Sequence, residues 1–185
     1  MASLAMPPYF LLLVWLWSRM DVHATNQKIA SLTKQKAFQE AYELFQSLVD
    51  GGKANQFTYS NILNAAIQCD NLSLAEEIHK KLRQDSHTKR FYYNVIIYTT
   101  MMKGYCQSLQ LLKAMLLTDE IIRFFNQSSS QPTSKTAQDP DYFKPNIRTF
   151  NTLLRGCIHV GNVIIAEEIF TTQGKMFKVT PEKTT

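Results

Sequence analysis

The sequence predicts an all-α protein, an α-solenoid of about four stacked helix-turn-helix repeats. An apolar stripe with the spacing i, i+3, i+4, i+7, i+8 occurs three times, starting at Tyr59, Tyr98 and Phe150. A second stripe, which has an alanine three residues after its first apolar residue, occurs four times. These alanines are separated by 34, 39 and 52 residues, and they are Ala41, Ala75, Ala114 and Ala166. A helical hairpin cannot bury its apolar face alone, so hairpins repeated at a period in the thirties are expected to stack.

The clearest hairpin covers residues 144–170. Thr149 stands just before its first stripe and is expected to satisfy a free backbone N–H at the start of a helix. Gly161 and Asn162 interrupt the apolar pattern, and both residue types tolerate the left-handed backbone that ends a helix. The second stripe then runs from Val163 to Phe170.

The three earlier hairpins are placed by the same two stripes. Their expected bounds are 26–48 with its better helix at 38–48, then 57–68 with 72–83, then 96–107 with 109–125. A small residue follows six positions after each starting aromatic, namely Ala65, Gly104 and Gly156. We expect neighbouring helices to approach closely at these positions because the side chains there are small.

Residues outside the stripes divide the chain further. Residues 1–21 form an apolar leader or targeting-like segment, 22–182 the repeat array, and 183–185 a polar tail. Residues 127–141 are rich in Ser, Thr, Gln and Pro without periodicity, so they are predicted to be a flexible insertion in the array. No capping helix is evident after Gly174, which predicts a short array, a truncated one, or one that depends on a partner.

The leader has no single interpretation. Its apolar run, Tyr9–Trp17, is shorter than the ~20 residues that span a bilayer. It resembles the apolar core of a secretory signal, but no basic residue precedes it, and it lacks the arginines of an amphipathic presequence. A targeting remnant, a membrane-adhering tail and an odd end of an incomplete gene model all stay open, so membrane contact by this segment is uncertain.

Composition and motifs argue against catalysis. The net charge of +5 and the pI near 9.1 suit an anionic partner such as RNA, although many inert proteins share them. The three cysteines, Cys69, Cys106 and Cys157, lie on or beside apolar stripes and are expected to be buried, reduced thiols. The sequence contains no phosphate-binding glycine loop, no metalloprotease helix motif and no nucleophile elbow. We therefore expect no enzyme activity, cofactor, metal or small-molecule substrate.

Three copies of the repeat share a sequence motif that is more specific than a generic helical hairpin. The stretch 144–154, KPNIRTFNTLL, continues with Gly156, Gly161 and Ala166, and it resembles the pentatricopeptide repeat. Residues 58–63 and 98–106 resemble the same motif, and the resemblance covers roughly residues 22–182. It implies a right-handed superhelix whose first helices line a concave basic groove for single-stranded RNA. It also implies that each repeat recognises about one base through two or three side chains.

The resemblance also assigns base-reading residues. One reader directly follows the aromatic of the first stripe, and the other closes the repeat. The pairs are Ser60 with Asn94, Thr99 with Asn146, and Asn26 with Asn55; Asn151 is a reader whose partner is uncertain, with Glu182 one residue out of register. By the family's pattern, a reading pair of a small hydroxyl residue with Asn favours adenine, and a reading pair of two Asn residues favours a pyrimidine. From spacing alone, Asn and Ser near a helix start are more often helix caps or solvated residues.

A third residue of each repeat, two before the aromatic, is expected to pack against base faces. Phe57 and Ile96 suit this role because flat or branched apolar groups sandwich bases. Arg148 and His23 depart from the usual aliphatic residue, although Arg148 could stack or contact phosphate. The starting aromatics are expected to pack in the core and not to stack on bases.

These observations lead to one main functional expectation and two alternatives. The main one is a sequence-selective adaptor that binds single-stranded RNA in an organelle, a mitochondrion or plastid, and guides RNA processing, stability or translation without chemistry of its own. Protein partners of an RNA-processing complex would then be expected. The alternatives are a helical scaffold that binds a protein or peptide segment, and a truncated fragment of a longer repeat protein.

Overall fold

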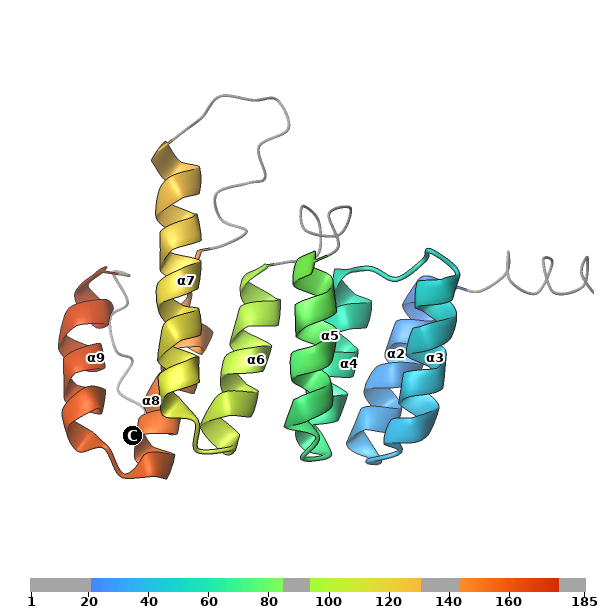
Figure 1. Ribbon diagram of the computed structural model, residues 1–185, viewed down its shortest axis with the longest axis horizontal. Coiled ribbons are helices and arrows are strands. Elements are labelled where there is room, and N and C mark those ends of the chain that lie inside the picture. Colours follow the sequence, from blue (N-terminus) through green and yellow to red (C-terminus); the bar gives the residue numbers. More distant parts are fainter. Residues whose placement is uncertain (1–20, 85–93, 131–143, 177–185) are drawn as a thin grey trace, which may run out of the picture.

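The computed structural model describes residues 21–84, 94–130 and 144–176, with the side chains of 127–130 and 172–176 left out. Eight α-helices and no strands form this part of the chain (Figure 1). They pair into four hairpins, and their bounds are α2 Val22–Lys34, α3 Phe38–Asp50, α4 Gln56–Gln68, α5 Leu72–Gln84, α6 Val95–Gln107, α7 Leu111–Ser130, α8 Ile147–Val160 and α9 Val163–Met176. The predicted α-solenoid is confirmed.

The helices form two layers of different spacing. The first helices of successive hairpins pack directly together, α2 on α4, α4 on α6 and α6 on α8. The second helices, α3, α5, α7 and α9, pack mainly on first helices and stand side by side along the array in Figure 1. Because the first helices are more closely spaced, their layer forms the inner, concave side of the stack.

Each hairpin repeats the same local geometry. The first helices begin at N-cap residues whose side chains accept backbone N–H bonds, namely Asp21, Asn55, Asn94 and Asn146. Fifteen positions later, every turn contains a residue with positive φ, in order Lys36, Asp70, Leu109 and Gly161. The fourth of these is glycine and the second is aspartate, two residue types that accept this conformation, whereas lysine and leucine do not suggest it. The shared register allows every position to be compared across the four repeats.

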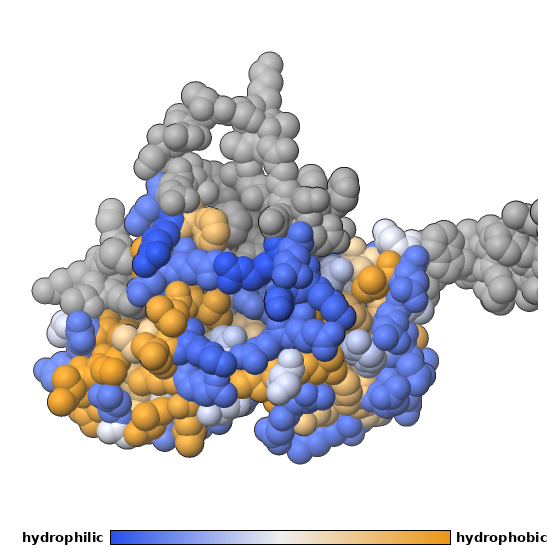
Figure 2. Space-filling view, in the orientation of Figure 1, coloured by the Kyte–Doolittle hydropathy of each residue, from blue (hydrophilic) through white to orange (hydrophobic). Residues whose placement is uncertain are grey.

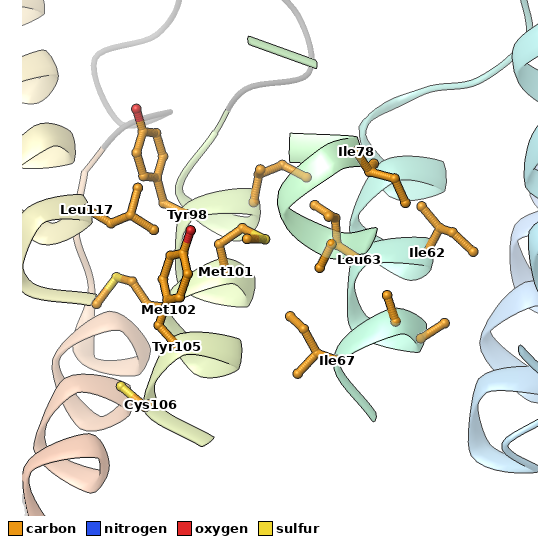
Figure 3. Packing of buried hydrophobic residues seen from close by; sticks show 14 of the residues in the cluster. Ile62, Leu63, Ile67, Ile78, Tyr98, Met101, Met102, Tyr105, Cys106 and Leu117 are labelled. Carbon is orange, nitrogen blue, oxygen red and sulfur yellow. The ribbon is translucent and has the colours of Figure 1, made fainter. Parts of the chain in front are cut away.

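Close approach between first helices depends on the predicted small residues. A Cβ added to Gly104 would lie 2.9 Å from side-chain atoms of Ile67 on α4. A Cβ added to Gly156 would lie 2.3 Å from the Sγ atom of Cys106 on α6. Figure 3 shows Cys106 directed from α6 toward α8, and Met101 and Met102 of α6 between Leu63 of α4 and Leu117 of α7. The expectation of tight helix packing at these positions is therefore confirmed.

The starting aromatics are core residues, as expected. Tyr98 is fully buried, Phe150 is buried and Tyr59 is half-buried. Each contacts a second aromatic ring from an outer helix; Tyr59 meets Phe45 edge-on at a centroid distance of 5.5 Å. These rings are not available to stack on bases.

Two helix boundaries differ from expectation. The Thr149 hydroxyl accepts a backbone N–H at the start of α8, as expected, but the helix begins three residues earlier than its position suggested: Asn146 is the N-cap, and Thr149 completes a capping box with it. The helix predicted over 109–125 is α7, which begins at Leu111 because Leu109 occupies the left-handed turn, and which continues to Ser130. Helix therefore covers the first four residues of the predicted insertion 127–141, and the rest of it lies outside the described residues.

The cysteines largely follow expectation. Cys106 and Cys157 are buried free thiols, and burial raises the pKa of the Cys106 thiol to about 11. Cys69 is only half-buried, beside the turn of the second hairpin. Within the described part of the chain, no cluster of His, Cys, Asp and Glu could hold a metal ion. No helix there is both long and apolar enough to cross a membrane.

A buried histidine makes stability depend on pH. His79 on α5 is only 6% exposed, and burial, helped by the positive charge of Arg83, lowers its pKa to about 4. The unfolded chain, with a His pKa near 6.5, binds a proton before the folded chain does, so stability falls as pH drops from about 6.5 toward 4. At pH 5 the loss from this residue is about 2 kcal/mol relative to pH 7. Urea denaturation at the two pH values measures it.

A glutamine variant isolates the effect. His79→Gln should remove most of the stability difference between pH 7 and pH 5. The pKa of Glu76 is lowered by its hydrogen bond to Lys113, and that carboxylate loses stabilising energy only when pH falls below its ordinary value of 4.5. An unchanged pH dependence in His79→Gln would contradict the assignment.

Candidate nucleic-acid interface

A groove of about 470 Å³ crosses the concave layer from α4 over α6 to α8. Its lining includes five of the predicted site residues, Ser60, Ile96, Thr99, Asn146 and Arg148. These residues come from three repeats and span almost 90 positions in the sequence, and the register places them side by side. The central expectation of a shared hollow face is thereby met for these five.

A second groove of about 460 Å³ lies over α2 and α4. It is lined by Asn26, Asn55 and Phe57, together with His23. Asn61 of α4 lines both grooves, so the two adjoin along the concave layer. Eight of the ten predicted RNA-contacting residues therefore line one extended groove, and the other two, Asn94 and Asn151, do not.

The asparagines that close each repeat are helix caps. The Oδ1 atom of Asn55 accepts the backbone N–H groups of Phe57 and Thr58 at 3.0 and 3.1 Å. Asn94 and Asn146 cap α6 and α8 in the same way. The capping alternative is thus confirmed for all three. Capping uses the amide oxygen, so the amide NH₂ of each is the group left for other contacts.

Asn94 differs from the other two capping asparagines because it is buried. It is 4% exposed, and its amide donates to the Oε1 atom of Gln56, the first residue of α4, at 2.8 Å. Both functional groups of Asn94 are therefore occupied: the oxygen caps α6, and the amide NH₂ joins the third repeat to the second. A base could reach this side chain only after the Gln56 contact had opened.

Replacing Asn94 tests the capping role. We expect Asn94→Ala to lower the free energy of unfolding by about 1–2 kcal/mol, because two N–H groups lose their acceptor and Gln56 loses its donor. Asn94→Asp keeps the capping oxygen and should recover most of the loss. Urea denaturation measures both variants, and an unchanged midpoint for Asn94→Ala would contradict the role.

The first predicted reader of each repeat has different contacts. The Thr99 hydroxyl lies 3.0 Å from the Thr149 hydroxyl, which in turn contacts the Asn146 amide oxygen, so this predicted pair is linked through Thr149. Asn26 donates directly to Asn55 at 3.2 Å. The Asn26 Oδ1 atom is buried without a hydrogen-bond partner, alone among the described side-chain polar atoms. A buried acceptor in this condition costs stability until a donor reaches it, and Asn26 also lines the second groove.

Asn151 occupies the same register position on α8 as Ser60 and Thr99 on their helices. It is exposed and does not line the groove. The equivalent Thr99 faces the following first helix, and among the described residues no first helix follows α8. Asn151 therefore lies on the same side of the stack but at its open end.

The predicted base-packing residues are exposed beside the grooves. Phe57 is 56% and Ile96 44% exposed, although both are apolar. Arg148 is also exposed, and its backbone N–H is bound by Asn146. Exposed apolar side chains spaced one repeat apart are suited to packing between flat ligands.

Sequence reasoning missed two cations of the concave layer. Lys103 lines the main groove, and it shares a smaller adjoining one of about 170 Å³ with Arg155. Lys103 also donates to the Oδ1 atom of Asn64 at 3.1 Å. Asn64, Lys103 and Arg155 share one register position, nine after the N-cap. Extending the helical period from the predicted readers by one turn would have found this position.

Charge is divided between the two layers. The first helices α2, α4, α6 and α8 contain five Lys and Arg residues and no Asp or Glu. Apart from Asp21 at the start of α2 and Asp70 in a turn, the described carboxylates lie on the second helices, where some form ion pairs such as Glu76–Lys113 and Glu120–Arg83. No described residue that lines the concave grooves is acidic. The concave layer is thus basic and rich in hydroxyl and amide groups, as a surface for a polyanion requires.

An all-helical array of stacked hairpins with a concave, amide-lined groove defines the class of helical-repeat proteins. The pentatricopeptide repeat domain model matches residues 44–102 and 137–182, and the single PPR repeat model matches residues 96–124. Since these matches cover more than half of the chain, the protein belongs to the pentatricopeptide repeat family, whose members typically bind RNA. No curated protein matches the chain.

Proposed function

We propose that the chain binds single-stranded RNA sequence-selectively in the concave groove and acts as a non-enzymatic adaptor in organellar RNA processing, stability or translation. The observation that carries the proposal is the convergence of Ser60, Thr99 and Asn146 with Lys103 and Arg148 in one groove that lacks carboxylates. Hydroxyl and amide groups can pair with base edges, and the cations can neutralise phosphates. Membership of the family supports both parts, and the organellar setting, in a mitochondrion or plastid, follows from the family alone.

The size of the array limits the expected affinity. Four repeats would contact about four bases, and stacking contributes about 1–3 kcal/mol per base. Ordering of the RNA and of the groove side chains offsets part of this gain. We therefore propose weak binding by the isolated chain, strengthened by protein partners in a larger RNA-processing complex.

Binding of the purified chain to a library of short single-stranded RNAs, at two salt concentrations, tests the proposal. Adenine-rich sequences should be enriched, because two of the reading pairs combine a hydroxyl residue with Asn. Affinity should fall as salt rises, since phosphate contacts release counterions. A chain that binds no RNA even at low salt would favour the alternative scaffold for a protein or peptide.

A single exchange tests base selection directly. Ser60→Asn converts the second reading pair, Ser60 with Asn94, from hydroxyl–Asn to Asn–Asn. Once RNA has opened the contact between Asn94 and Gln56, preference at one base should change from adenine to a pyrimidine. The expected discrimination is about 1–3 kcal/mol, by analogy with other side-chain contacts to base edges. The library selection measures it. Ser73→Asn on α5, in the outer layer, is the matched control and should leave the preferred sequence unchanged.

A further inference from the structure

The outer face of the third repeat carries three exposed leucines. Leu109, Leu112 and Leu116 are 61%, 71% and 58% exposed. The last two lie on α7 and the first in the turn before it, and their spacing of three and four residues places them on one side of the helix. We call these three residues the leucine stripe. It lies on the second-helix layer, away from the concave groove.

The repeat register shows that the fold itself does not require these leucines. In the first repeat, the three equivalent residues are Lys36, Gln39 and Glu43, and in the second they are Asp70, Ser73 and Glu77. All six are polar and exposed, so the same outward positions are ordinary solvent-facing surface there. Leu109 also has a φ of 58°, at the turn position that glycine occupies in the fourth repeat. Leucine adopts this left-handed conformation less readily than glycine does, so the turn itself does not explain why a leucine is present.

The apolar surface continues onto the next outer helix. Val163 and Ile164, at the start of α9, are 74% and 80% exposed. Figure 2 shows hydrophobic residues gathered over the lower parts of α7 and α9, whereas hydrophilic residues predominate at the opposite end of the array, over α3. Exposed apolar side chains grouped in this way mark interaction surfaces more often than isolated ones do.

The charges around the stripe indicate the kind of partner. The nearest ion pair, Lys113 with Glu76, contains both signs, and Asp119 and Arg123 follow on α7. A rim of mixed sign does not suit RNA or an anionic membrane, which require an excess of cations. A mixed polar rim around an apolar centre is the usual composition of a protein–protein interface.

We propose that the leucine stripe is the contact surface between two copies of this chain. A stripe on one side of a single helix is self-complementary when a two-fold axis sets the helix antiparallel to its copy, because leucines then lie between leucines. The mixed rim supports the same partner, since it presents opposite charges to its own copy, whereas a rim of one sign would repel it. The patch is small for a permanent dimer, so the dimer dissociates in the micromolar range, roughly 1–100 µM.

Sedimentation velocity of the full chain across that concentration range tests the proposal. The wild-type chain should shift from monomer to dimer as concentration rises. Leu112→Glu combined with Leu116→Glu should raise the dissociation constant at least about tenfold, because two carboxylates enter the contact on each side. Both leucines are exposed, so the variant should fold, and its helical circular dichroism and melting temperature should match the wild type.

The matched control adds the same charge at equivalent positions elsewhere. Gln39→Glu combined with Ser73→Glu places two carboxylates on α3 and α5 at the register position of Leu112, and this variant should dimerise like the wild type. A wild-type chain that stays monomeric at the highest concentration overturns the proposal. A leucine variant that dimerises as tightly as the wild type also overturns it, since the contact would then lie elsewhere on the chain.

Discussion

Gly156→Val should destabilise the chain by about 3 kcal/mol, near the upper end of the range for overpacked cores. A Cβ at this position would lie 2.3 Å from the Cys106 Sγ atom and 3.0 Å from the Cys106 Cβ atom. The sulfur can rotate, but the Cys106 Cβ atom is fixed to the α6 backbone, so α6 must also move from α8 by a few tenths of an ångström. That movement would loosen the packing of the third repeat on the fourth. Urea denaturation followed by circular dichroism measures the loss.

The repeat register supplies a control for this prediction. Ser31 holds the same position on α2, but no described helix precedes α2 in the stack, and Ser31 is exposed. We expect Ser31→Val to change stability by no more than about 0.5 kcal/mol, as for other surface changes. Combining Gly156→Val with Cys106→Ala should restore part of the loss, because the sulfur atom is removed. Additive effects of the two substitutions would show that the clash is not the cause.

The helix positions could be predicted from the sequence because apolar periodicity and burial coincide in a stacked array. The stripes that start at Tyr98 and Phe150 correspond to the buried faces of α6 and α8. Ends of helices were less predictable. Leu109 adopts a left-handed conformation that its residue type does not suggest, and α7 continues to Ser130 through a polar sequence with no apolar pattern.

The candidate groove could be predicted where it depends on the repeat register. It could not be predicted where it depends on hydrogen bonds between particular side chains. Register alone brings Ser60 and Asn146 to one groove, and the spacing of the stripes is sufficient to find it. Asn94 has the same register but is buried, because Gln56 happens to begin the preceding first helix and accepts its amide. Such a contact between residues 38 positions apart depends on the three-dimensional fit of two helices, which residue spacing does not contain.

Removing the concave cations should weaken RNA binding and its dependence on salt together. Lys103→Gln combined with Arg155→Gln takes two positive charges from the layer that faces the groove. If each cation neutralises one phosphate of a single strand, the slope of log affinity against log salt should fall by about 1.4. Affinity in dilute salt should fall about tenfold or more. Titrations of a labelled adenine-rich RNA at several salt concentrations measure both quantities.

The position of the removed charges distinguishes this prediction from one that rests on the net charge of the chain alone. Lys80→Gln combined with Arg123→Gln removes the same two charges from the outer helices α5 and α7. If binding depended only on the net charge of +5, both double variants would lose affinity equally. If RNA lies in the groove, the outer variant should keep nearly the full slope, because charges separated from the strand by more than the Debye length of ~10 Å are screened. Equal losses in the two variants would therefore remove the groove as the binding surface, even with RNA binding itself intact.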